Sequence, residues 1–174
     1  ATGSSGIGRE PDALRFFMPG VSCNSGAICV RTSATVGSDA SDQVSTFTWA
    51  ARILASKRFP EGERLAIVTN GGGPGVVAAD SAAENGVPLA SLSEETVANL
   101  DRVLPQQWSR GNPVDVIGDA PAERFQQATE AALADPGVDA VLTMYSPVAV
   151  TQPEEAARAV AEAARTSSKP VLAA

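Results

Sequence analysis

The stretch LAIVTNGGGPG, Leu65–Gly75, decides the fold of this chain. Its opening run, Leu65–Thr69, is short and apolar up to its last residue, as a strand covered by helices on both faces requires. Asn70–Gly75 then supplies turn-forming residues, and Val76–Glu84 has the composition of a helix. A buried strand followed by a glycine turn and a helix is the first half of a βαβ unit, so the sequence predicts a parallel sheet.

On both sides of this stretch, short apolar runs alternate with amphipathic runs along most of the chain. Ser93 is the expected N-cap of one helix, and Thr151-Gln152-Pro153-Glu154 is expected to begin another as a capping box. The predicted strands are Leu65–Thr69, Pro88–Leu92, Ala140–Tyr145 and Pro170–Ala174, with a short extended piece at Asn112–Asp119. The predicted helices are Thr46–Lys57, Val76–Glu84, Glu94–Val103, Ala122–Ala134 and Thr151–Ala164. Together they predict a three-layer α/β sandwich of the flavodoxin-like kind, with a parallel sheet of four to five strands and helices on both faces.

Residues 1–45 differ in character from the rest of the chain. They are rich in Gly, Ser, Thr and Asp and show no sustained period of 3.6 or 2, so we expect loops and one strand there. We therefore divide the chain into 1–45, an irregular remnant of a preceding domain or a linker, and 46–174, the α/β domain. Because the sequence stops inside the apolar run Pro170–Ala174, we expect either a longer protein or a core completed by association.

The composition limits the classes of function. The chain has 174 residues, of which 44% are hydrophobic and 19% charged, which is typical of a globular protein. A net charge of −7 opposes binding to nucleic acid, and no apolar run reaches the roughly 18 residues of a membrane span. We expect a cytoplasmic protein that binds neither. Histidine is absent, which excludes Ser-His-Asp triads and histidine-based metal sites, and we expect no metal site.

Two cysteines, Cys23 and Cys29, stand six positions apart. That spacing is too wide for a CxxC redox motif, and two sulfurs are too few for a four-sulfur metal site. We interpret them as ordinary thiols of a reduced compartment, with a short-loop disulfide or a reactive thiol as the alternative.

The first candidate site is the glycine-rich turn Asn70–Gly75. Glycines permit positive φ and let an anion approach the backbone, and the helix that follows offers unpaired N–H groups and a positive dipole end. The pattern is neither GxGxxG nor GxxxxGK[ST], so the dinucleotide and Walker fingerprints are both missing. Either the turn binds a phosphate or phosphoryl group, or it is only a tight strand-to-helix connection. The candidate residues are Asn70, Gly71, Gly72, Gly73 and Gly75.

The second candidate site comprises polar residues that follow later strands. Asn112, Asp115 and Asp119 surround the short extended piece, and Ser146 follows the strand at Ala140–Tyr145. The carboxyl edge of a parallel sheet is where open α/β folds bind ligands, so we expect these four residues at that edge. The structural alternative is that Asp119 caps the next helix, Asp115 satisfies the loop backbone and Ser146 lies in a turn.

Residues 64–174 resemble a known family in three stretches: RLAIVTNGGGPGVVAAD, GNPVDVIGDAPAERFQQATEAALADPGVDAVLTMYSP and KPVLAA. The family is the flavodoxin-like CoA-ligase domain of the NDP-forming acyl-CoA synthetases, relatives of succinyl-CoA synthetase. The resemblance makes 46–174 such a domain, truncated at its C-terminus. It also implies a reversible reaction in which acyl-CoA, ADP and phosphate exchange with the free acid, ATP and CoA, through an acyl phosphate and a phosphohistidine.

The same resemblance assigns a role to the glycine-rich turn. In the family, a helix N-terminus of this domain faces the phosphohistidine, which implies that Asn70–Gly75 stabilises the phosphoryl group. The implied partners are CoA-binding, histidine-bearing and ATP-grasp domains in the same or another chain. CoA, ADP or ATP (with GDP not distinguished) and magnesium are implied for the complete enzyme, and none is assigned to this fragment. A homo-oligomer is a further expectation.

The sequence departs from the family pattern at the histidine. The family often carries a stretch like SHTGALAGSDA, and this chain has VRTSATVGSDA at Val30–Ala40, which places Arg31 in the histidine position. We therefore expect the isolated chain to be inactive. The alternative function is a non-catalytic binding or regulatory module derived from such a synthetase. A free-standing flavin binder or receiver is a third, fold-based alternative.

Overall fold

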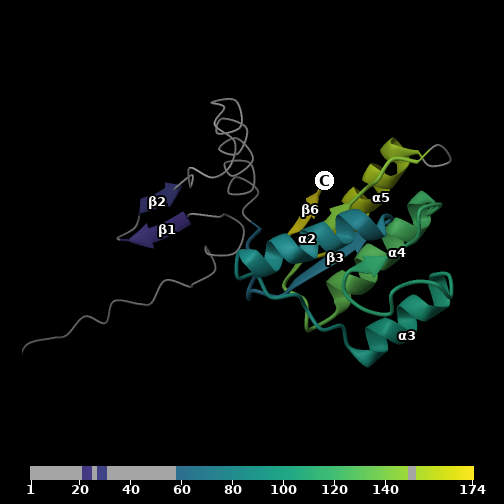
Figure 1. The fold of residues 1–174 in the computed structure, drawn as a ribbon, viewed down its shortest axis with the longest axis horizontal. Helices are drawn as coiled ribbons and strands as arrows, with labels where there is room; N and C mark the ends of the chain where they lie inside the picture. The colour runs from purple at the N-terminus through teal and green to yellow at the C-terminus, as the bar shows by residue number, and fades with distance from the viewer. Residues whose placement is uncertain (1–20, 25–26, 31–57, 149–151) are drawn as a thin grey trace, which may run out of the picture.

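Four parallel strands form one sheet in the described part of the chain, and Figure 1 shows them at the centre of the domain. The computed structural model describes residues 21–24, 27–30, 58–148 and 152–174. The strands are β3 (Leu65–Thr69), β4 (Val114–Asp115), β5 (Ala140–Met144) and β6 (Val171–Ala173), and their order is β4-β3-β5-β6. Counted along the chain, this is the order 2-1-3-4 of a doubly wound, flavodoxin-like sheet. The predicted fold class is confirmed.

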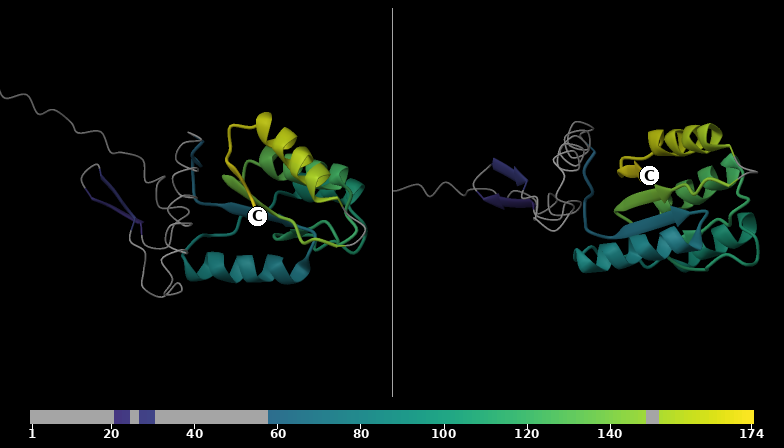
Figure 2. Two further views of the ribbon diagram at one scale, coloured as in Figure 1. Left: turned by 90° about the horizontal axis from the view of Figure 1, so that it is seen from above. Right: turned by 45° about the horizontal axis from the view of Figure 1, so that its top comes forward.

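Helices cover both faces of the sheet, as Figure 2 shows. On one face, Leu65 and Ile67 of β3 pack with Ala82 of the first helix. On the other face, Val68 packs in a larger cluster with Phe125. Because both faces are covered, all five residues of β3 are buried, which explains why its sequence does not alternate. The helices are α2 (Gly72–Glu84) on the first face, α4 (Ala122–Ala134) and α5 (Pro153–Arg165) on the second, and α3 (Glu94–Val103) beside α4.

Two helices have the bounds that the sequence predicts. α3 begins after Ser93, whose side-chain oxygen accepts a hydrogen bond from the Thr96 amide at 3.2 Å, and α4 has the predicted ends. None of the helices in the described part of the chain is long and apolar enough to cross a membrane. The predicted helix at 46–57 lies outside the described residues.

The other two helices begin differently from the prediction. α2 begins at Gly72 instead of Val76, so most of the glycine-rich turn is the first turn of the helix. Gly71 is the N-cap, and Pro74 is tolerated in a first turn because its missing N–H would have no partner there. α5 begins after Gln152, whose side chain forms no capping hydrogen bond. The predicted capping box is therefore wrong as the start of α5, and Thr151 lies outside the described residues.

The predicted strand at 88–92 is wrong, because only Leu89 pairs with the sheet, at Leu65. The Leu65 amide donates to the Pro88 carbonyl at 2.9 Å, and the Ala90 amide donates to the Leu65 carbonyl at 2.8 Å. After Leu65, the side chain of Asn112 forms hydrogen bonds along the edge of β3 where a strand would pair. Asn112 Oδ1 accepts from the Ile67 amide at 2.9 Å, so this amide is not available to a residue of the 88–92 segment.

An antiparallel hairpin replaces the single strand that we expected in residues 1–45. Strand β1 (Val21–Asn24) pairs with β2 (Ala27–Val30), so the expectation of one strand is wrong. The register places Ser22 opposite Cys29 and Cys23 opposite Ile28. The two cysteines are thus not cross-strand partners.

An ion pair between Arg64 and Asp139 lies at the amino end of β3. Asp139 accepts from the Arg64 amide at 2.9 Å, from Arg64 Nε at 2.8 Å and from Nη2 at 2.9 Å. The hydrogen bonds from Arg64 hold the pKa of Asp139 below its usual value, although burial of the carboxylate opposes them. The positive charge of Lys169 lowers the pKa of Asp139 further.

The lowered pKa of Asp139 predicts how the stability of the domain depends on pH. The folded state favours the carboxylate, so its contribution is complete above about pH 4 and disappears as the pH falls through the lowered folded-state value. Asp139→Asn should lower the melting temperature at pH 7 and flatten the acid side of the stability curve. Thermal melts of both proteins between pH 7 and pH 2 check this. Parallel acid limbs would contradict it.

Candidate functional site

The carboxyl ends of β3 and β5 meet at the point where the sheet changes direction. The chain leaves β3 for α2 on one face and leaves β5 for α5 on the opposite face. In doubly wound sheets this switch point opens a crevice between the two connections, and ligands bind there. Asn70 and Gly71 follow β3, and Ser146 follows β5. Three of the predicted site residues therefore lie at the switch point of the sheet.

The side chain of Asn70 joins the two connections. Its Nδ2 donates to the Ser146 carbonyl at 2.9 Å, and its Oδ1 accepts from the Ser146 amide at 2.7 Å. Asn70 is only 3% exposed, so this reciprocal pair is nearly shielded from water. The carboxamide of Asn70 is therefore used to position Ser146, and its own polar atoms already have partners.

Glycine is required at two positions of this turn by close packing. A Cβ on Gly71 would lie 2.7 Å from Ser146 Oγ, and a Cβ on Gly75 would lie 2.9 Å from Thr69 Cγ2. Thr69 cannot withdraw freely, because its Oγ1 accepts from the Gly71 amide at 3.1 Å. A Cβ on Gly73 would meet nothing within 4 Å. Thus Gly71 and Gly75 let the start of α2 approach the sheet, and Gly73 faces open space.

These glycines give a matched pair of stability predictions. Gly75→Ala should destabilise the domain by about 1–3 kcal/mol, because the new methyl overlaps buried Thr69. Gly73→Ala should stabilise it by about 0.5–1 kcal/mol, because alanine loses less backbone entropy in a helix and here has room. Urea unfolding of both variants measures the difference. Equal effects of the same sign would contradict the packing at Gly75.

The N-terminus of α2 carries free amide donors. The first hydrogen bond within the helix runs from the Gly75 amide to the Gly71 carbonyl at 3.1 Å, and no side chain caps the helix start. This leaves the exposed Gly72 and Gly73 amides at the positive end of the dipole, equivalent to about half a unit charge. Among the helices α2–α5, α2 alone has no acidic residue in its first turn.

Asp115 brings one carboxylate to the same place. A Cβ on Gly72 would lie 3.4 Å from Asp115 Oδ2, so this oxygen sits beside the start of α2. The other oxygen, Oδ1, accepts from the Ile117 amide at 2.8 Å, as the structural alternative for Asp115 requires. Ile117 has φ 69°, an unusual value for a β-branched residue. Asp115 thus belongs with the glycine turn and Ser146.

Asn112 and Asp119 form their side-chain bonds outside this group, although Gly118, next to Asp119, approaches the Asn70 carbonyl: a Cβ there would lie 3.8 Å from it. The amide of Asn112 lies between β3 and the 88–90 segment, where Nδ2 donates to the Leu65 carbonyl at 2.7 Å and to the Ala90 carbonyl at 2.9 Å. Asp119 is largely exposed and pairs with Arg124 at 2.9 Å. It does not cap α4, whose N-cap is Pro121, so that structural alternative is wrong.

Sequence reasoning missed Thr69 as part of the site. Its hydroxyl accepts from the Gly71 amide and donates to the Gly71 carbonyl, both at 3.1 Å, and so fixes the turn. A threonine directly before Asn-Gly is a local signal for such a side-chain turn. Among residues 58–148 and 152–174, no three His, Cys, Asp or Glu side chains are grouped as a metal site. The donors at this place are the backbone N–H groups at the start of α2 and the Ser146 hydroxyl, and Asp115 adds one carboxylate beside them.

Comparisons with known proteins agree with this fold. The family model of the Ligase-CoA domain matches residues 65–174. The chain is 42% identical over 111 residues to acetate–CoA ligase [ADP-forming] I of Archaeoglobus fulgidus, covering 64% of this chain and 16% of that protein. It is 38% identical over 119 residues to acetate–CoA ligase [ADP-forming] II subunit alpha of Pyrococcus furiosus, covering 66% of this chain and 26% of that subunit.

A solved structure shares the same architecture. The dinucleotide-forming acetyl-coenzyme A synthetase 1 of Ca. Korarchaeum cryptofilum, in complex with phosphate and ADP, aligns with a TM-score of 0.62 and 40% identity. The alignment covers 66% of this chain and 25% of that one. This chain therefore spans about a quarter or less of the relatives named here.

Proposed function

This chain belongs to the Ligase-CoA domain family, and from that premise we propose that it is the ligase domain of an NDP-forming acyl-CoA synthetase. The complete enzyme would exchange acyl-CoA, ADP and phosphate for the free acid, ATP and CoA. In this proposal the N-terminus of α2 stabilises the phosphoryl group while it is carried between the acyl phosphate and the nucleotide.

One observation supports the proposal most strongly: the free donors of α2 lie at the switch point of the sheet. Two helices share with α2 the lack of a capping side chain, but α4 has Glu123 in its first turn and α5 has Glu154 and Glu155. Acidic residues there already occupy the positive end of the dipole. Among helices α2–α5 of the described residues, α2 alone combines a first turn free of acidic residues, a close glycine approach and a start at the switch point of the sheet.

The residues of the site have separate roles in this proposal. The Gly72 and Gly73 amides donate hydrogen bonds to oxygens of the phosphoryl group, and the dipole of α2 stabilises its negative charge. Asn70 holds Ser146 beside the helix start, where the Ser146 hydroxyl supplies a further donor. Asp115 Oδ2 lies beside this position, and the other oxygen of the carboxylate accepts from the Ile117 amide at 2.8 Å.

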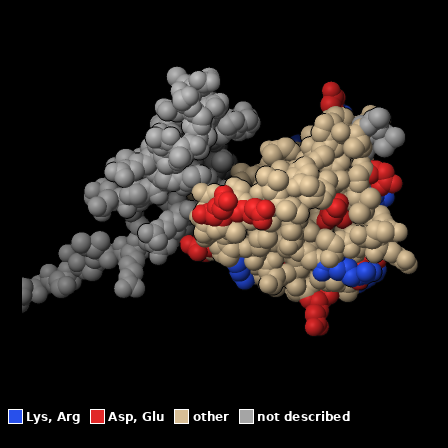
Figure 3. Space-filling view, viewed as in Figure 1, with Lys and Arg blue, Asp and Glu red and all other residues tan. Residues whose placement is uncertain are grey.

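The phosphoryl carrier must come from elsewhere, because the 174 residues contain no histidine. We propose partner domains that bind CoA, bear the histidine and form an ATP-grasp nucleotide site, with residues 1–45 belonging to the preceding domain or a linker. The outer side of α2 suits such a contact: Val76 is 58% and Val77 68% exposed, next to the free amides. Figure 3, viewed from the α2 side, shows that residues other than Lys, Arg, Asp and Glu make up most of this face, with acidic side chains at separate places on it.

The absence of histidine also favours a second candidate function. A non-catalytic binding or regulatory module derived from a synthetase would keep the fold and lose phosphoryl transfer. The complete reading frame separates the two: adjacent histidine-bearing and ATP-grasp domains support the enzyme, and their absence from the gene and its neighbours supports the module.

Phosphate titration of the ¹⁵N-labelled chain, at ionic strength held constant with sodium chloride, tests the site itself. Saturable shifts of the Gly72 and Gly73 amide resonances are expected, and those of the first turns of α4 and α5 should not move. The unperturbed helix starts serve as internal controls. Shifts at all three helix starts, or at none, would contradict the proposed phosphoryl site.

A further inference from the structure

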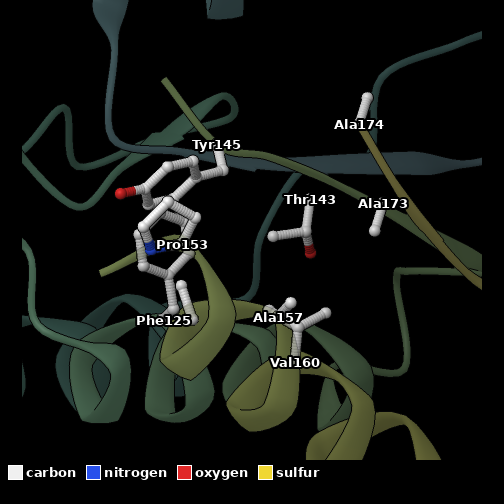
Figure 4. A pocket seen from close by; sticks show the side chains of 9 residues that line it. Phe125, Thr143, Tyr145, Pro153, Ala157, Val160, Ala173 and Ala174 are labelled. Carbon is white, nitrogen blue, oxygen red and sulfur yellow. The ribbon is translucent and has the colours of Figure 1, made fainter. Parts of the chain in front are cut away.

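The two faces of the sheet offer different surroundings to a charged ligand. On the face of α4 and α5, Figure 4 shows a pocket whose described lining, with Phe125 and Val160, contains no charged side chain. An anion placed there would lose its hydration without compensation. At the start of α2, in contrast, backbone N–H groups lie beside the Ser146 hydroxyl and the Asp115 carboxylate. Any preference among anions must therefore come from the groups at the start of α2.

The register of the sheet places Asp115 beside the start of α2. Asp115 pairs with Thr69, the last residue of β3, so it lies at the same edge of the sheet as the glycine-rich turn. Its Oδ1 accepts from the Ile117 amide at 2.8 Å, which holds the carboxylate in one orientation. A Cβ on Gly72 would lie 3.4 Å from Oδ2. Oδ2 therefore lies next to the place where an anion would meet the Gly72 amide.

This second oxygen of Asp115 is not paired within the domain. No N–H or O–H group of residues 58–148 and 152–174 donates to Oδ2, and none of the ion pairs in these residues includes Asp115. Because a carboxylate only accepts hydrogen bonds, Oδ2 can be satisfied only by a donor. An anion oxygen that carries a proton would donate to Oδ2, whereas an anion without a proton would meet an uncompensated like charge.

We propose that Asp115 makes the site at α2 select hydrogen phosphate, which retains one proton, over tetrahedral anions of similar size that have none. This inference rests on the proposed phosphoryl role of α2 and names the ligand that the same site prefers. The N–H groups of α2 and the Ser146 hydroxyl donate to the unprotonated oxygens, and the protonated oxygen donates to Asp115 Oδ2. Sulfate would satisfy the same donors, but it has no proton for Oδ2 and is repelled by it.

The test compares phosphate with sulfate on the full 174-residue chain labelled with ¹³C. At about pH 8 phosphate is mainly HPO₄²⁻, so the two dianions differ mainly in the proton. The shift of the Gly72 ¹³Cα resonance, at ionic strength held constant with sodium chloride, gives the dissociation constant of each anion. The parent should bind phosphate at least about tenfold more tightly than sulfate. Similar constants would overturn the selectivity and leave the phosphoryl site intact, whereas no saturable shift with either anion would contradict both.

Two variants assign the selectivity to one carboxylate. Asp115→Asn keeps an oxygen for the Ile117 amide and offers an N–H donor in place of Oδ2, so sulfate should bind within about threefold of phosphate. Asp80→Asn is the matched control: it removes the same charge from an exposed position of α2, about two helical turns beyond Gly72, and should keep the preference of the parent. Undiminished preference for phosphate in Asp115→Asn, or its loss in Asp80→Asn, would overturn the role of Asp115. The comparison of the two anions on the parent depends on neither variant.

Discussion

Replacing Asn112 with alanine should destabilise the domain by about 3 kcal/mol. The side chain of Asn112 makes three hydrogen bonds to the backbone, with Ile67, Leu65 and Ala90, over distances of 2.7–2.9 Å. At Ile67 the side chain makes the hydrogen bond that a neighbouring strand would otherwise make, because β4 pairs only with Val68 and Thr69 of β3. Alanine would leave the Ile67 amide and the Ala90 carbonyl without these partners, each costing about 1–3 kcal/mol before water or relaxation compensates, whereas the Leu65 carbonyl keeps the Ala90 amide.

Asn112→Asp is the sharper companion to this variant. It keeps the oxygen that accepts from Ile67 and replaces the donor to Leu65 and Ala90 with a second acceptor, so it should be at least as destabilising as alanine. Asn99→Ala removes an exposed bond to Arg102 and should change stability by less than about 0.5 kcal/mol. Urea unfolding at pH 7 measures all three. A loss below about 1 kcal/mol for both Asn112 variants would contradict the role assigned to this residue.

The parts of the fold that could be predicted from the sequence are those with local causes. The strand at Leu65–Thr69 is a continuous apolar run because both faces of β3 are covered, and α3 begins where Ser93 caps it. The prediction of a strand at 88–92 is wrong because the apolar pattern is local, whereas the pairing of this segment is set by Asn112, a residue far along the chain. Propensity cannot show that a side chain will take the place of a strand.

The candidate site divides in the same way. The glycine turn could be predicted from the sequence because a turn and a helix start are local patterns, although α2 begins earlier than expected. The bond between Asn70 and Ser146 joins residues 76 positions apart, and the approach of Asp115 to Gly72 depends on the order of β3 and β4. Such contacts follow from the sheet order, which the spacing of elements does not fix. The contacts of Asn112 with Leu65 and Ala90 have the same origin.

Replacing Gly73 with aspartate should weaken phosphate binding at α2 at least about tenfold without unfolding the domain. A side chain at this position meets nothing within 4 Å, so it is accommodated. A carboxylate in the first turn interacts favourably with the dipole by about 0.3–1 kcal/mol, and aspartate is a better helix residue than glycine. The variant should therefore be as stable as the parent or more so, while its negative charge repels the phosphoryl group from the free amides.

Gly73→Asn provides the matched control, because it has nearly the same shape and no charge. The central claim is that the N-terminus of α2 holds an anion through its amides and its dipole. The direct measurement is the phosphate dissociation constant of the parent, Gly73→Asn and Gly73→Asp chains at one ionic strength, from the Gly72 amide shift. We predict comparable values for the first two and at least about tenfold weaker binding by Gly73→Asp. Equal phosphate affinity of the Asp and Asn variants would contradict the claim.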